Sequence, residues 1–580
     1  MVSKNAWICN QKSLRREGWD VLDLILTGKY RKVIGFAAKG GNLRGTMMDY
    51  PLVLPVFLER AGKLFGNIEI VSRKPDRTLV RSNYGSFYER ARRLAEALTK
   101  LGLRRGDRVA SMMWNHAGHL EAFFGVPCAG GILHTLNLRL HPHEIAGIAN
   151  HAGDRFLIVD DVLLPLYEKF REDVKFERVI VAPFGFDSVP GGYLNYEVLL
   201  AETTGDFRYP ELDENDGAAM CFTSGTTGFS KGVIYTHRSL VLHSMAEAMV
   251  DTFAMSHHDT MMPLAPMFHA NAWGVPHTAV MTGTKLVFMG PNVEAEAVLD
   301  LMMSEKVTVA NAVPTVWISV LEALEREPRR WKFEKSVRIV SGGTAPPVEL
   351  MRRLDRFGLH ILHLWGMTET SPLATTGHLK ARMLDWPEEK KYPVRAKQGW
   401  PVPLIELRIM RPEGEAPWDG NTPGEIEVRG PWVASHYYES PDQAYKWSED
   451  GWFRTGDVGT LNADGIMKLV DRAKDLVKSG GEWISSVDLE NSLMGHPAVK
   501  EACVVGVPHP KWQERPLAVV VLKEGTSASE LELRDFLAES FAKWQLPDAF
   551  VFVEAIPRTS VGKFKKIALR EQYANWRWES

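Results

Sequence analysis

An alternation of helix-like and strand-like segments constrains the fold of this 580-residue chain more than any other feature. Ser86 and Glu89 form the S-x-x-E pattern of a capping box, and apolar residues then recur at helical spacing as far as Leu101. Gly102 ends this pattern, and residues 107–113 read as a buried strand. Similar pairs of segments continue to about residue 400. The pattern predicts an α/β fold in which helices cover mostly parallel sheets.

The pattern changes after about residue 400, where the apolar segments become short and end in Gly, Pro or Asp turns. This texture favours a small β subdomain. The last part of the chain alternates again, which predicts a small C-terminal α+β domain. The elements expected in these two regions are strands at 405–409, 424–429, 465–470, 499–507, 517–522 and 549–553 and a helix at 529–542.

Composition excludes several classes of protein. Hydrophobic residues make up 45% of the chain and charged residues 24%, as in globular rather than disordered or fibrous proteins. A net charge of -3 argues against a globally basic nucleic-acid binder. The four cysteines form no C-x-x-C pair, so we expect no disulfide framework or zinc knuckle, and a reducing, cytoplasmic location. Because no run of 18 apolar residues occurs, we expect no membrane-spanning helix.

Residues 1–45 differ from the rest in holding nine basic residues and three acidic ones. They contain neither the continuous apolar stretch nor the A-x-A site of a secretory signal, and the acidic residues argue against a transit peptide. Residues 21–26 form a candidate amphipathic helix, which leaves peripheral contact with a membrane open. We interpret 1–45 as a surface extension of unknown role.

The strongest local signal is the segment TSGTTGFSKG at 223–232. Its three glycines let the backbone approach an anion closely, and its successive amides form an anion-binding nest. Five hydroxyls and the ammonium of Lys231 add donors, so a polyphosphate is the expected guest. A P-loop requires Lys directly after its last Gly, but Phe229 follows Gly228, which excludes that interpretation.

This loop resembles the phosphate-binding signature of the adenylate-forming superfamily, which includes acyl-CoA synthetases, luciferases and the adenylation domains of peptide synthetases. The family usually has Pro before the lysine, where this chain has Ser230. The resemblance implies that the loop binds ATP, with Thr223 and Lys231 also catalytic and Thr223 also a metal ligand. The loop residues that it assigns to ATP are Thr223, Ser224, Gly225, Thr226, Thr227, Gly228 and Lys231.

Two further motifs resemble the adenine side of the family's site. SGGTA at 341–345 is similar to the adenine-side loop, and WGMTE at 365–369 is similar to an aromatic-Gly-x-Thr-Glu segment. In the family the aromatic ring stacks on adenine, the threonine contacts phosphate and the glutamate, here Glu369, is catalytic and helps to hold Mg²⁺. The residues implied for ATP are Gly343, Thr344, Ala345, Trp365, Gly366, Met367 and Thr368.

Two charged segments resemble the ribose side and the hinge. GWFRTGD at 451–457 matches the family's W-x-x-T-G-D element, in which the aspartate, here Asp457, accepts the ribose hydroxyls. The segment 471–483 is similar to the hinge and the start of the C-terminal domain. The resemblance places the hinge at Lys474. It implies nucleotide-binding roles for Asp457, Arg472, Lys474, Lys478 and Trp483.

The segment PRTSVGK at 557–563 resembles the family's C-terminal loop with its catalytic lysine, here Lys563. Carboxylate attack on the α-phosphate brings two anions together, and an ammonium can bridge them. The resemblance implies three parts: an extension at 1–45, a large adenylation domain at 46–473 and a small mobile lid at 474–580. Within the large domain it implies layered α/β sheets and a small β-barrel-like subdomain.

The segments 267–273 and 541–547 look most similar to bacterial medium- and long-chain fatty acyl-CoA synthetases. In that subgroup the tryptophan matching Trp273 gates an apolar tunnel, and His269 and Gly366 fall beside the acyl substrate. The implied reaction joins a fatty acid to coenzyme A through an acyl-adenylate. It uses ATP and Mg²⁺ and releases AMP and pyrophosphate.

Alternatives remain open at this point. The carboxylate could be a short thioether, a branched acid or an aryl acid, and a luciferase-like oxygenase belongs to the same superfamily. A non-catalytic ATP-binding relative is an alternative of another class, although the joint presence of Glu369, Asp457 and Lys563 argues against it. The family resemblance also predicts a homodimer with small-molecule substrates and no nucleic-acid partner.

Overall fold

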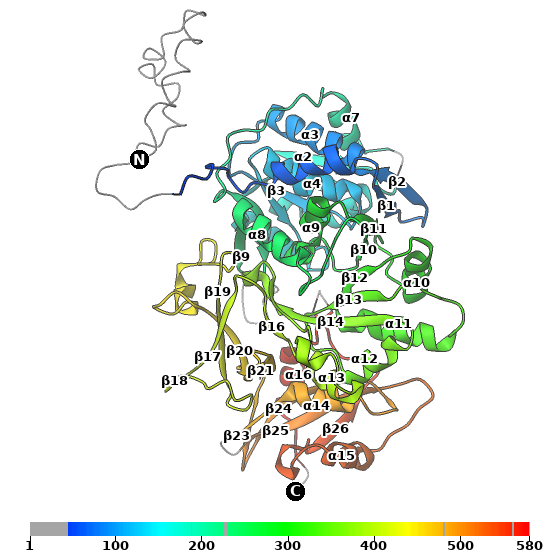
Figure 1. The fold of residues 1–580 in the computed structure, drawn as a ribbon, viewed down its shortest axis with the longest axis vertical. Helices are drawn as coiled ribbons and strands as arrows, with labels where there is room; N and C mark the ends of the chain where they lie inside the picture. The colour runs from blue at the N-terminus through cyan, green and yellow to red at the C-terminus, as the bar shows by residue number, and fades with distance from the viewer. Residues whose placement is uncertain (1–44, 187, 224–229, 480–481, 560–561, 579–580) are drawn as a thin grey trace, which may run out of the picture. The chain divides into compact units, whose positions relative to one another are not determined.

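The computed structural model describes residues 45–186, 188–223, 230–479, 482–559 and 562–578. It divides into two units, Met1–Tyr50 and Pro51–Ser580. Of the first unit only 45–50 are described, and they form exposed coil. The helix expected at 21–26 lies outside the described residues. All described helices and strands belong to the second unit (Figure 1), and none of these helices is long and apolar enough to cross a bilayer.

A seven-stranded sheet is parallel except at one edge, where β8 and β9 are antiparallel. Both faces are buried: Val109 of β3 points into one core cluster and Ala110 into another. The strand expected at 107–113 is therefore confirmed as β3. The order is β7 (Leu194–Asn195), β6 (Arg178–Ala182), β5 (Asp154–Asp160), β3 (Arg108–Met112), β4 (Ile132–Thr135), β8 (Gly217–Phe222) and β9 (Gly232–Thr236).

A nine-stranded sheet is parallel in its centre and antiparallel at both ends. The carboxyl ends of its parallel strands meet at one edge, which is where α/β sheets bind ligands. The order is β16 (Trp400–Pro401), β15 (Leu373–Thr376), β14 (Leu359–Gly366), β13 (Val337–Ser341), β12 (Val309–Ala312), β10 (Thr260–Pro263), β11 (Lys285–Phe288), β1 (Glu69–Arg73) and β2 (Leu79–Asn83).

Helix α4 (Ala117–Cys128) is buried between these two sheets. It contacts β1 of one sheet and β3, β4 and β8 of the other, and every residue of 119–128 is buried. A mostly apolar helix is expected in such a place, and its one carboxylate, Glu121, is paired with Arg90 at 2.7 Å. Helices packed against α4 or its neighbours are α2 (Pro55–Phe65), α3 (Tyr84–Lys100), α8 (His237–Ala248) and α9 (Val275–Thr282).

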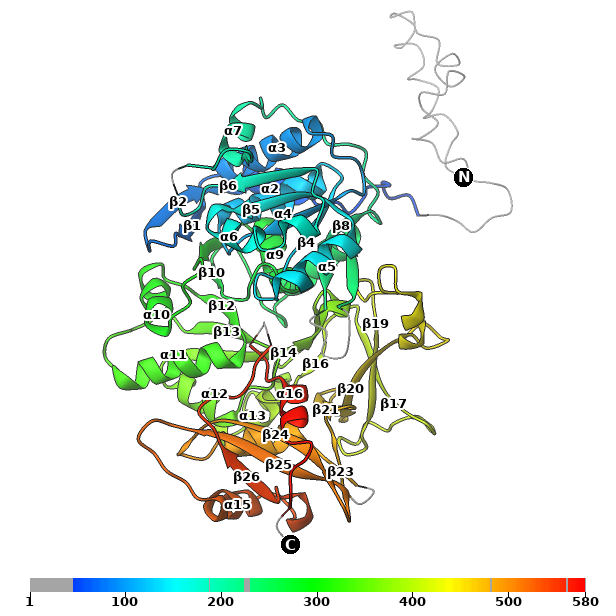
Figure 2. The ribbon, with the colours of Figure 1, turned by 180° about the vertical axis from the view of Figure 1, so that it is seen from behind.

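The remaining helices of the large domain contribute to the outer clusters or the edges. Figure 2 shows α5 and α6 beside β4 and β5. The α-helices are α5 (Pro142–Ala152), α6 (Leu164–Tyr167), α7 (Tyr196–Ala201), α10 (Ala295–Ser304), α11 (Pro314–Arg326), α12 (Val348–Asp355) and α13 (Glu388–Arg395). The 3₁₀ helices of the second unit are η2 (Asp161–Leu163), η3 (Arg171–Asp173), η4 (Ala270–Gly274), η5 (Thr368–Thr370), η6 (Ala381–Met383), η7 (Pro441–Lys446) and η8 (Lys543–Gln545).

The β subdomain expected after residue 400 is a five-stranded antiparallel sheet. The strand expected at 424–429 has those bounds, and the one expected at 405–409 is shifted by one or two residues. The strand expected at 465–470 starts two residues later, because Gly465 closes a turn on Asn462. The order is β18 (Gly414–Glu415), β17 (Glu406–Arg411), β19 (Gly424–Arg429), β20 (Phe453–Leu461) and β21 (Met467–Arg472).

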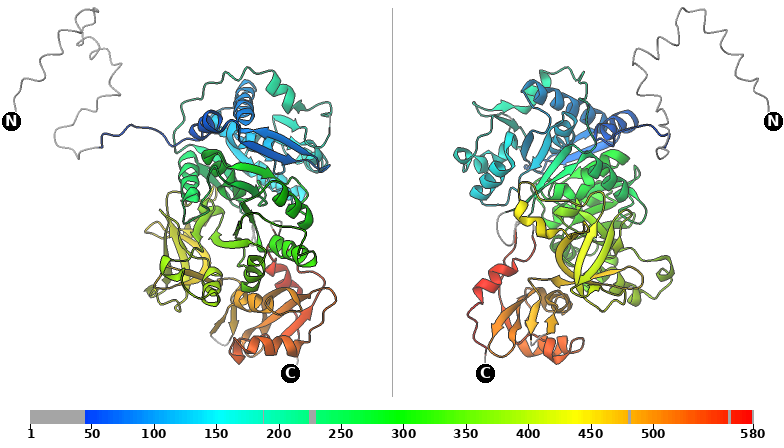
Figure 3. Two further views of the ribbon diagram at one scale, coloured as in Figure 1. Left: turned by 45° about the vertical axis from the view of Figure 1, so that its right-hand side comes forward. Right: turned by 90° about the vertical axis from the view of Figure 1, so that its left-hand side faces the viewer.

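The C-terminal α+β domain has a sheet with a core on each face. Val504 belongs to the core that α14 and α15 cover, and Val505 to the core beside α16. Figure 3 shows this sheet at one end of the second unit. Its elements are β22 (Val477–Ser479), β23 (Glu482–Ile484), α14 (Ser486–Leu493), β24 (Val499–His509), β25 (Gln513–Leu522), α15 (Glu530–Ala538), β26 (Ala549–Phe552) and α16 (Lys566–Gln572).

Two predicted helix boundaries are wrong. Helix α3 begins at Tyr84, and the side chain of Asn83 caps it by accepting a hydrogen bond from the Ser86 amide at 2.9 Å. Asn caps helices as well as Ser does, so Asn83 starts the helix three residues before Ser86. The residues of the predicted capping box therefore lie inside the helix. Ser529 does cap α15, but that helix ends at Ala538, four residues early, as the amides of 540 and 541 both close on the Leu537 carbonyl.

Candidate active site

The phosphate loop leaves β8 and returns as β9, so its two ends lie on adjacent antiparallel strands. The Thr223 amide donates to the Lys231 carbonyl at 2.9 Å, and the Lys231 amide donates to Thr223 Oγ1 at 3.1 Å. These bonds hold the two predicted residues side by side. The predicted residues between them that lie outside the described residues are Ser224, Gly225, Thr226, Thr227 and Gly228.

The ammonium of Lys231 is held over an aromatic ring. Its Nζ lies 5.2 Å from the centroid of Tyr437 and donates to Oε1 of Gln443. Burial, together with nearby Lys446, lowers the pKa of Lys231, while Glu369 raises it. The ammonium of Lys231 therefore interacts electrostatically with the carboxylate of Glu369.

Glu369 lies in η5, directly after β14 ends at Gly366. Its side chain is buried, and the Tyr437 hydroxyl donates to its Oε1 at 2.5 Å. The neighbouring carbonyl of Thr368 accepts from the Tyr235 hydroxyl at 2.7 Å. A β-carbon at Gly366 would lie 1.8 Å from a backbone oxygen, so only glycine permits this turn.

Asp457 joins the ribose-side and adenine-side motifs. Its Oδ2 accepts a hydrogen bond from the indole nitrogen of Trp365 at 2.9 Å, and its Oδ1 lies 3.3 Å from Nε of Arg472. Asp457 and Arg472 face each other across β20 and β21, and Asp457 is the main cause of the raised pKa of Arg472. The indole therefore supplies a donor that orients this carboxylate.

Lys563 reaches this cluster from the C-terminal domain. A β-carbon at Gly343, which follows β13 and has a φ of 88°, would lie 3.3 Å from Cε of Lys563. Burial and Arg472 lower the pKa of Lys563 to about 8, although Asp457 and Glu369 act in the opposite direction. The three charged residues that the sequence singled out, Asp457, Glu369 and Arg472, therefore all act electrostatically on the lysine.

Trp273, which the sequence predicts to contact the acyl substrate, lies near Gly343 through Val313. Trp273 is 7% exposed and packs with Ala270 and Val313, and Val313 is also 3.3 Å from a β-carbon placed at Gly343. All residues of η4 have positive φ, from 36° to 81°. Because a left-handed conformation costs a non-glycine residue about 1–2 kcal/mol, the surrounding packing must impose it.

His269 immediately precedes this turn. Burial, Lys563 and Arg139 lower its pKa to about 3, so the imidazole is neutral. His269 and Thr223 line one cavity of about 10 Å³, room for about one water.

The remaining predicted residues lie at the margin of this cluster or away from it. Lys478 and Trp483 pair across the β22–β23 hairpin and are exposed, so the described structure does not bring them into the cluster. Lys474 lies in the turn directly after β21, between the five-stranded sheet and the C-terminal domain. Thr344 is exposed beside Gly343.

Three residues of the site belong to no motif that the sequence analysis found. Tyr235 contacts Thr368, Tyr437 contacts Glu369, and Gln443 contacts Lys231. Tyr235 follows the phosphate loop by only three residues, and the adjacent tyrosines 437 and 438 are a usable signal. Spacing alone could not connect these residues to residues 60 or more positions away.

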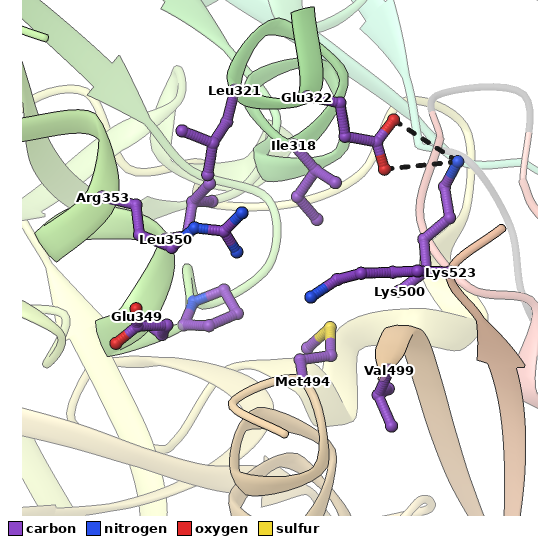
Figure 4. A pocket seen from close by; sticks show the side chains of 11 residues that line it. Ile318, Leu321, Glu322, Glu349, Leu350, Arg353, Met494, Val499, Lys500 and Lys523 are labelled. Atoms are coloured by element: carbon purple, nitrogen blue, oxygen red, sulfur yellow. Dashed lines mark hydrogen bonds and ion pairs between the residues drawn. The ribbon is translucent and has the colours of Figure 1, made fainter. Parts of the chain in front are cut away.

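A second cavity, of about 40 Å³, lies between the large and C-terminal domains (Figure 4). One of its walls comes from α11 and α12 and the other from the segments around Met494 and Lys523. Across it, Lys500 Nζ lies 3.4 Å from a carboxylate oxygen of Glu322. The lining residues are Ile318, Leu321, Glu322, Pro347, Glu349, Leu350, Arg353, Met494, Val499, Lys500 and Lys523.

Comparison with protein families identifies the class. The chain matches the family of AMP-binding enzymes over residues 66–438 and the AMP-binding enzyme C-terminal domain over residues 488–563. It therefore belongs to the adenylate-forming superfamily of AMP-binding enzymes.

Curated relatives narrow this class. The chain is 48% identical to a long-chain-fatty-acid–CoA ligase of Thermus thermophilus, covering 92% of this chain and 97% of the relative. It is 42% identical to a 3-methylmercaptopropionyl-CoA ligase of Ruegeria lacuscaerulensis (91% and 98% covered) and 40% identical to a medium-chain-fatty-acid–CoA ligase of Ectopseudomonas oleovorans (92% and 98% covered).

Among solved structures, the anthranilate CoA ligase AuaEII in complex with anthranoyl-AMP matches with a TM-score of 0.80 at 25% identity. The match covers 90% of this chain and 98% of that one. With these relatives, the protein is an AMP-forming acid–thiol ligase that uses ATP, Mg²⁺ and coenzyme A.

Proposed function

We propose that this ligase activates a medium- or long-chain fatty acid and transfers the acyl group to coenzyme A. The observation that carries this proposal is the junction at Val313. Val313 packs against Trp273 on one side. On the other side, Val313 and the side chain of Lys563 both approach Gly343. A carboxylate whose apolar tail lay along Trp273 would thus present its oxygens to the charged cluster.

In the first step, a carboxylate oxygen attacks the α-phosphorus of ATP and pyrophosphate leaves. Lys563 lies beside Gly343 and within electrostatic reach of Asp457, Glu369 and Arg472, and its ammonium offsets the charge of the two approaching anions. Lys231 and Thr223 hold the phosphates, and Asp457 with Trp365 holds the ribose and adenine. Positioning and charge neutralisation supply the catalysis, as in other phosphoryl chemistry.

The residues around Glu369 fit a magnesium ion. Mg²⁺ is usually bound by one or two protein carboxylates together with substrate phosphates and waters. Glu369 offers a buried carboxylate with one oxygen fixed by Tyr437, and Thr223 offers a hydroxyl at the end of the phosphate loop. We assign these two residues to the ion, which when bound neutralises phosphate charge.

In the second step, the thiol sulfur of coenzyme A attacks the acyl carbonyl. The bond from the carbonyl to the phosphate oxygen breaks, AMP leaves and the thiol proton is released. We propose that residues 474–580 form a lid that turns about Lys474 between the steps. The turn would withdraw Lys563 from Gly343.

The contact between Lys500 and Glu322 tests this proposal, because it forms only while the lid is in the present orientation. Its side chains are 37% and 39% exposed, so the pair contributes at most about 1 kcal/mol. Lys500→Glu should lower the rate of adenylation by about two- to fivefold without lowering thioesterification of supplied acyl-adenylate. The charge-swapped double variant with Glu322→Lys should restore the ratio of the two rates, measured by stopped flow. Equal slowing of both steps would contradict the proposal.

A short thioether acid is the second candidate substrate, because the 3-methylmercaptopropionyl-CoA ligase, at 42% identity, lies between the long-chain and medium-chain fatty-acid ligases, at 48% and 40%. AMP release should be measured with ATP, Mg²⁺ and coenzyme A over acids from acetate to oleate, with benzoate and methylthiopropionate. We expect kcat/KM to rise toward medium or long chains, with one acyl-CoA formed for each AMP. Activity confined to short or aryl acids would remove the gating role of Trp273, and no carboxylate-dependent AMP would favour a non-catalytic relative.

The family resemblance also supports three finer proposals. Trp273 and His269 would contact the acyl substrate, with Trp273 as the gate that closes the way past Val313. Two copies would form a homodimer. The protein would act in the cytoplasm, with any membrane contact peripheral.

A further inference from the structure

Tyr437 contacts both charged residues that flank the expected polyphosphate. Its hydroxyl donates to Oε1 of Glu369 at 2.5 Å, and its ring lies 5.2 Å from the ammonium of Lys231. The ring is itself fixed edge-on against Trp447, with 5.3 Å between centroids. Tyr437 is 5% exposed, so this geometry is set by packing rather than by solvent.

Lys231 and Glu369 are close but do not form an ion pair. Glu369 raises the pKa of Lys231, so the two charges interact. Among the described residues, however, no salt bridge within 4 Å joins them, and Lys231 instead donates to Gln443. A direct pair would satisfy both charges, and the pair would have to break before either residue could bind magnesium or phosphate.

We propose that Tyr437 is a positioning residue that keeps Glu369 and Lys231 apart, so that the carboxylate stays available to Mg²⁺ and the ammonium to phosphate. Its hydroxyl gives the anion a donor, and its π face gives the cation a partner. Each charge is thus satisfied without the other. The inference rests on the proposed role of Glu369 as a magnesium ligand.

The two functions of the ring and the hydroxyl can be separated by substitution. Tyr437→Phe keeps the ring beneath Lys231 and removes only the donor to Glu369. Tyr437→Leu removes both. A hydrogen bond to a charged group contributes enough that its loss should change binding by about tenfold.

The test is calorimetric binding of a non-hydrolysable ATP analogue to the full-length protein over a series of Mg²⁺ concentrations. It needs no turnover. For Tyr437→Phe we expect the Mg²⁺ concentration at half-maximal effect to rise about tenfold, while affinity for the analogue without Mg²⁺ is unchanged. For Tyr437→Leu we expect both quantities to worsen. Tyr438→Phe, the same change at the neighbouring tyrosine, should match the wild type.

A double-mutant cycle with Glu369→Gln separates this inference from the proposed function. If Tyr437 acts through the carboxylate, Tyr437→Phe should shift nothing further in the Glu369→Gln background. If Glu369→Gln shifts the Mg²⁺ dependence and Tyr437→Phe does not, the role of Tyr437 is wrong and that of Glu369 stands. If neither shifts it, the magnesium assignment itself is wrong. Equal loss of analogue binding with and without Mg²⁺ in a Tyr437→Phe protein of normal thermal stability would also overturn the inference.

Discussion

Lys563→Ala is expected to lower the rate of acyl-adenylate formation by about 10²–10³-fold, the effect of removing one preorganised charge-stabilising donor. The lysine lies against Gly343 and interacts electrostatically with Asp457, Glu369 and Arg472. Thioesterification of supplied acyl-adenylate should be nearly unchanged, because the proposed second step has Lys563 withdrawn.

The measurement is carboxylate-dependent exchange of pyrophosphate into ATP for the first step, and acyl-CoA formed from synthetic acyl-adenylate for the second. Lys565→Ala is the matched control, since that lysine is exposed two residues away. It should leave both rates unchanged. If Lys563→Ala slowed both half-reactions equally, Lys563 would not belong to the first step alone.

Glu369→Gln should have the second-largest effect, a loss of about 10–100-fold in adenylation that high Mg²⁺ partly recovers. Glutamine has the same shape and can still accept the Tyr437 hydroxyl, so the change removes charge rather than packing. A neutral amide oxygen is a weaker ligand for a hard cation.

Rates of adenylation measured against Mg²⁺ concentration check this expectation. Glu334→Gln, in an exposed pair with Lys306, is the control for the loss of one negative charge. It should leave the Mg²⁺ dependence as in the wild type. A Glu369→Gln defect that is constant at all Mg²⁺ concentrations would argue against the metal role.

The sequence indicated most of the fold because its signals are local. Buried strands such as 107–113 show as apolar runs, and the turn at Gly102 shows as a single glycine. Helix starts were less certain because Asn83 and Ser86 offer equivalent caps within three residues. The pairing of strands across the two large sheets follows from tertiary packing, which no local pattern contains.

The candidate site was predictable only in part, for a similar reason. Motifs with several residues in a fixed spacing, such as the one that ends at Asp457, were found. Tyr437 belongs to no motif of fixed spacing, and its role depends on its contact with Glu369, 68 positions earlier. Likewise, the family resemblance predicts that the indole of Trp365 stacks on adenine. Its hydrogen bond to Asp457 depends on how β14 and β20 lie in the fold, which the sequence does not show.

The order of strands in the nine-stranded sheet affects how the chain can be synthesised. Ile70 of β1 pairs with Leu286 of β11, and the whole seven-stranded sheet lies between them in sequence. At about 5–20 residues per second, β1 and β2 therefore wait roughly 10–40 seconds on the ribosome for that partner. During this interval the edge of β1 is an unpaired template for another chain. The free edge of β1 is therefore covered only after the seven-stranded sheet and β11 have been synthesised, unless a chaperone binds it earlier.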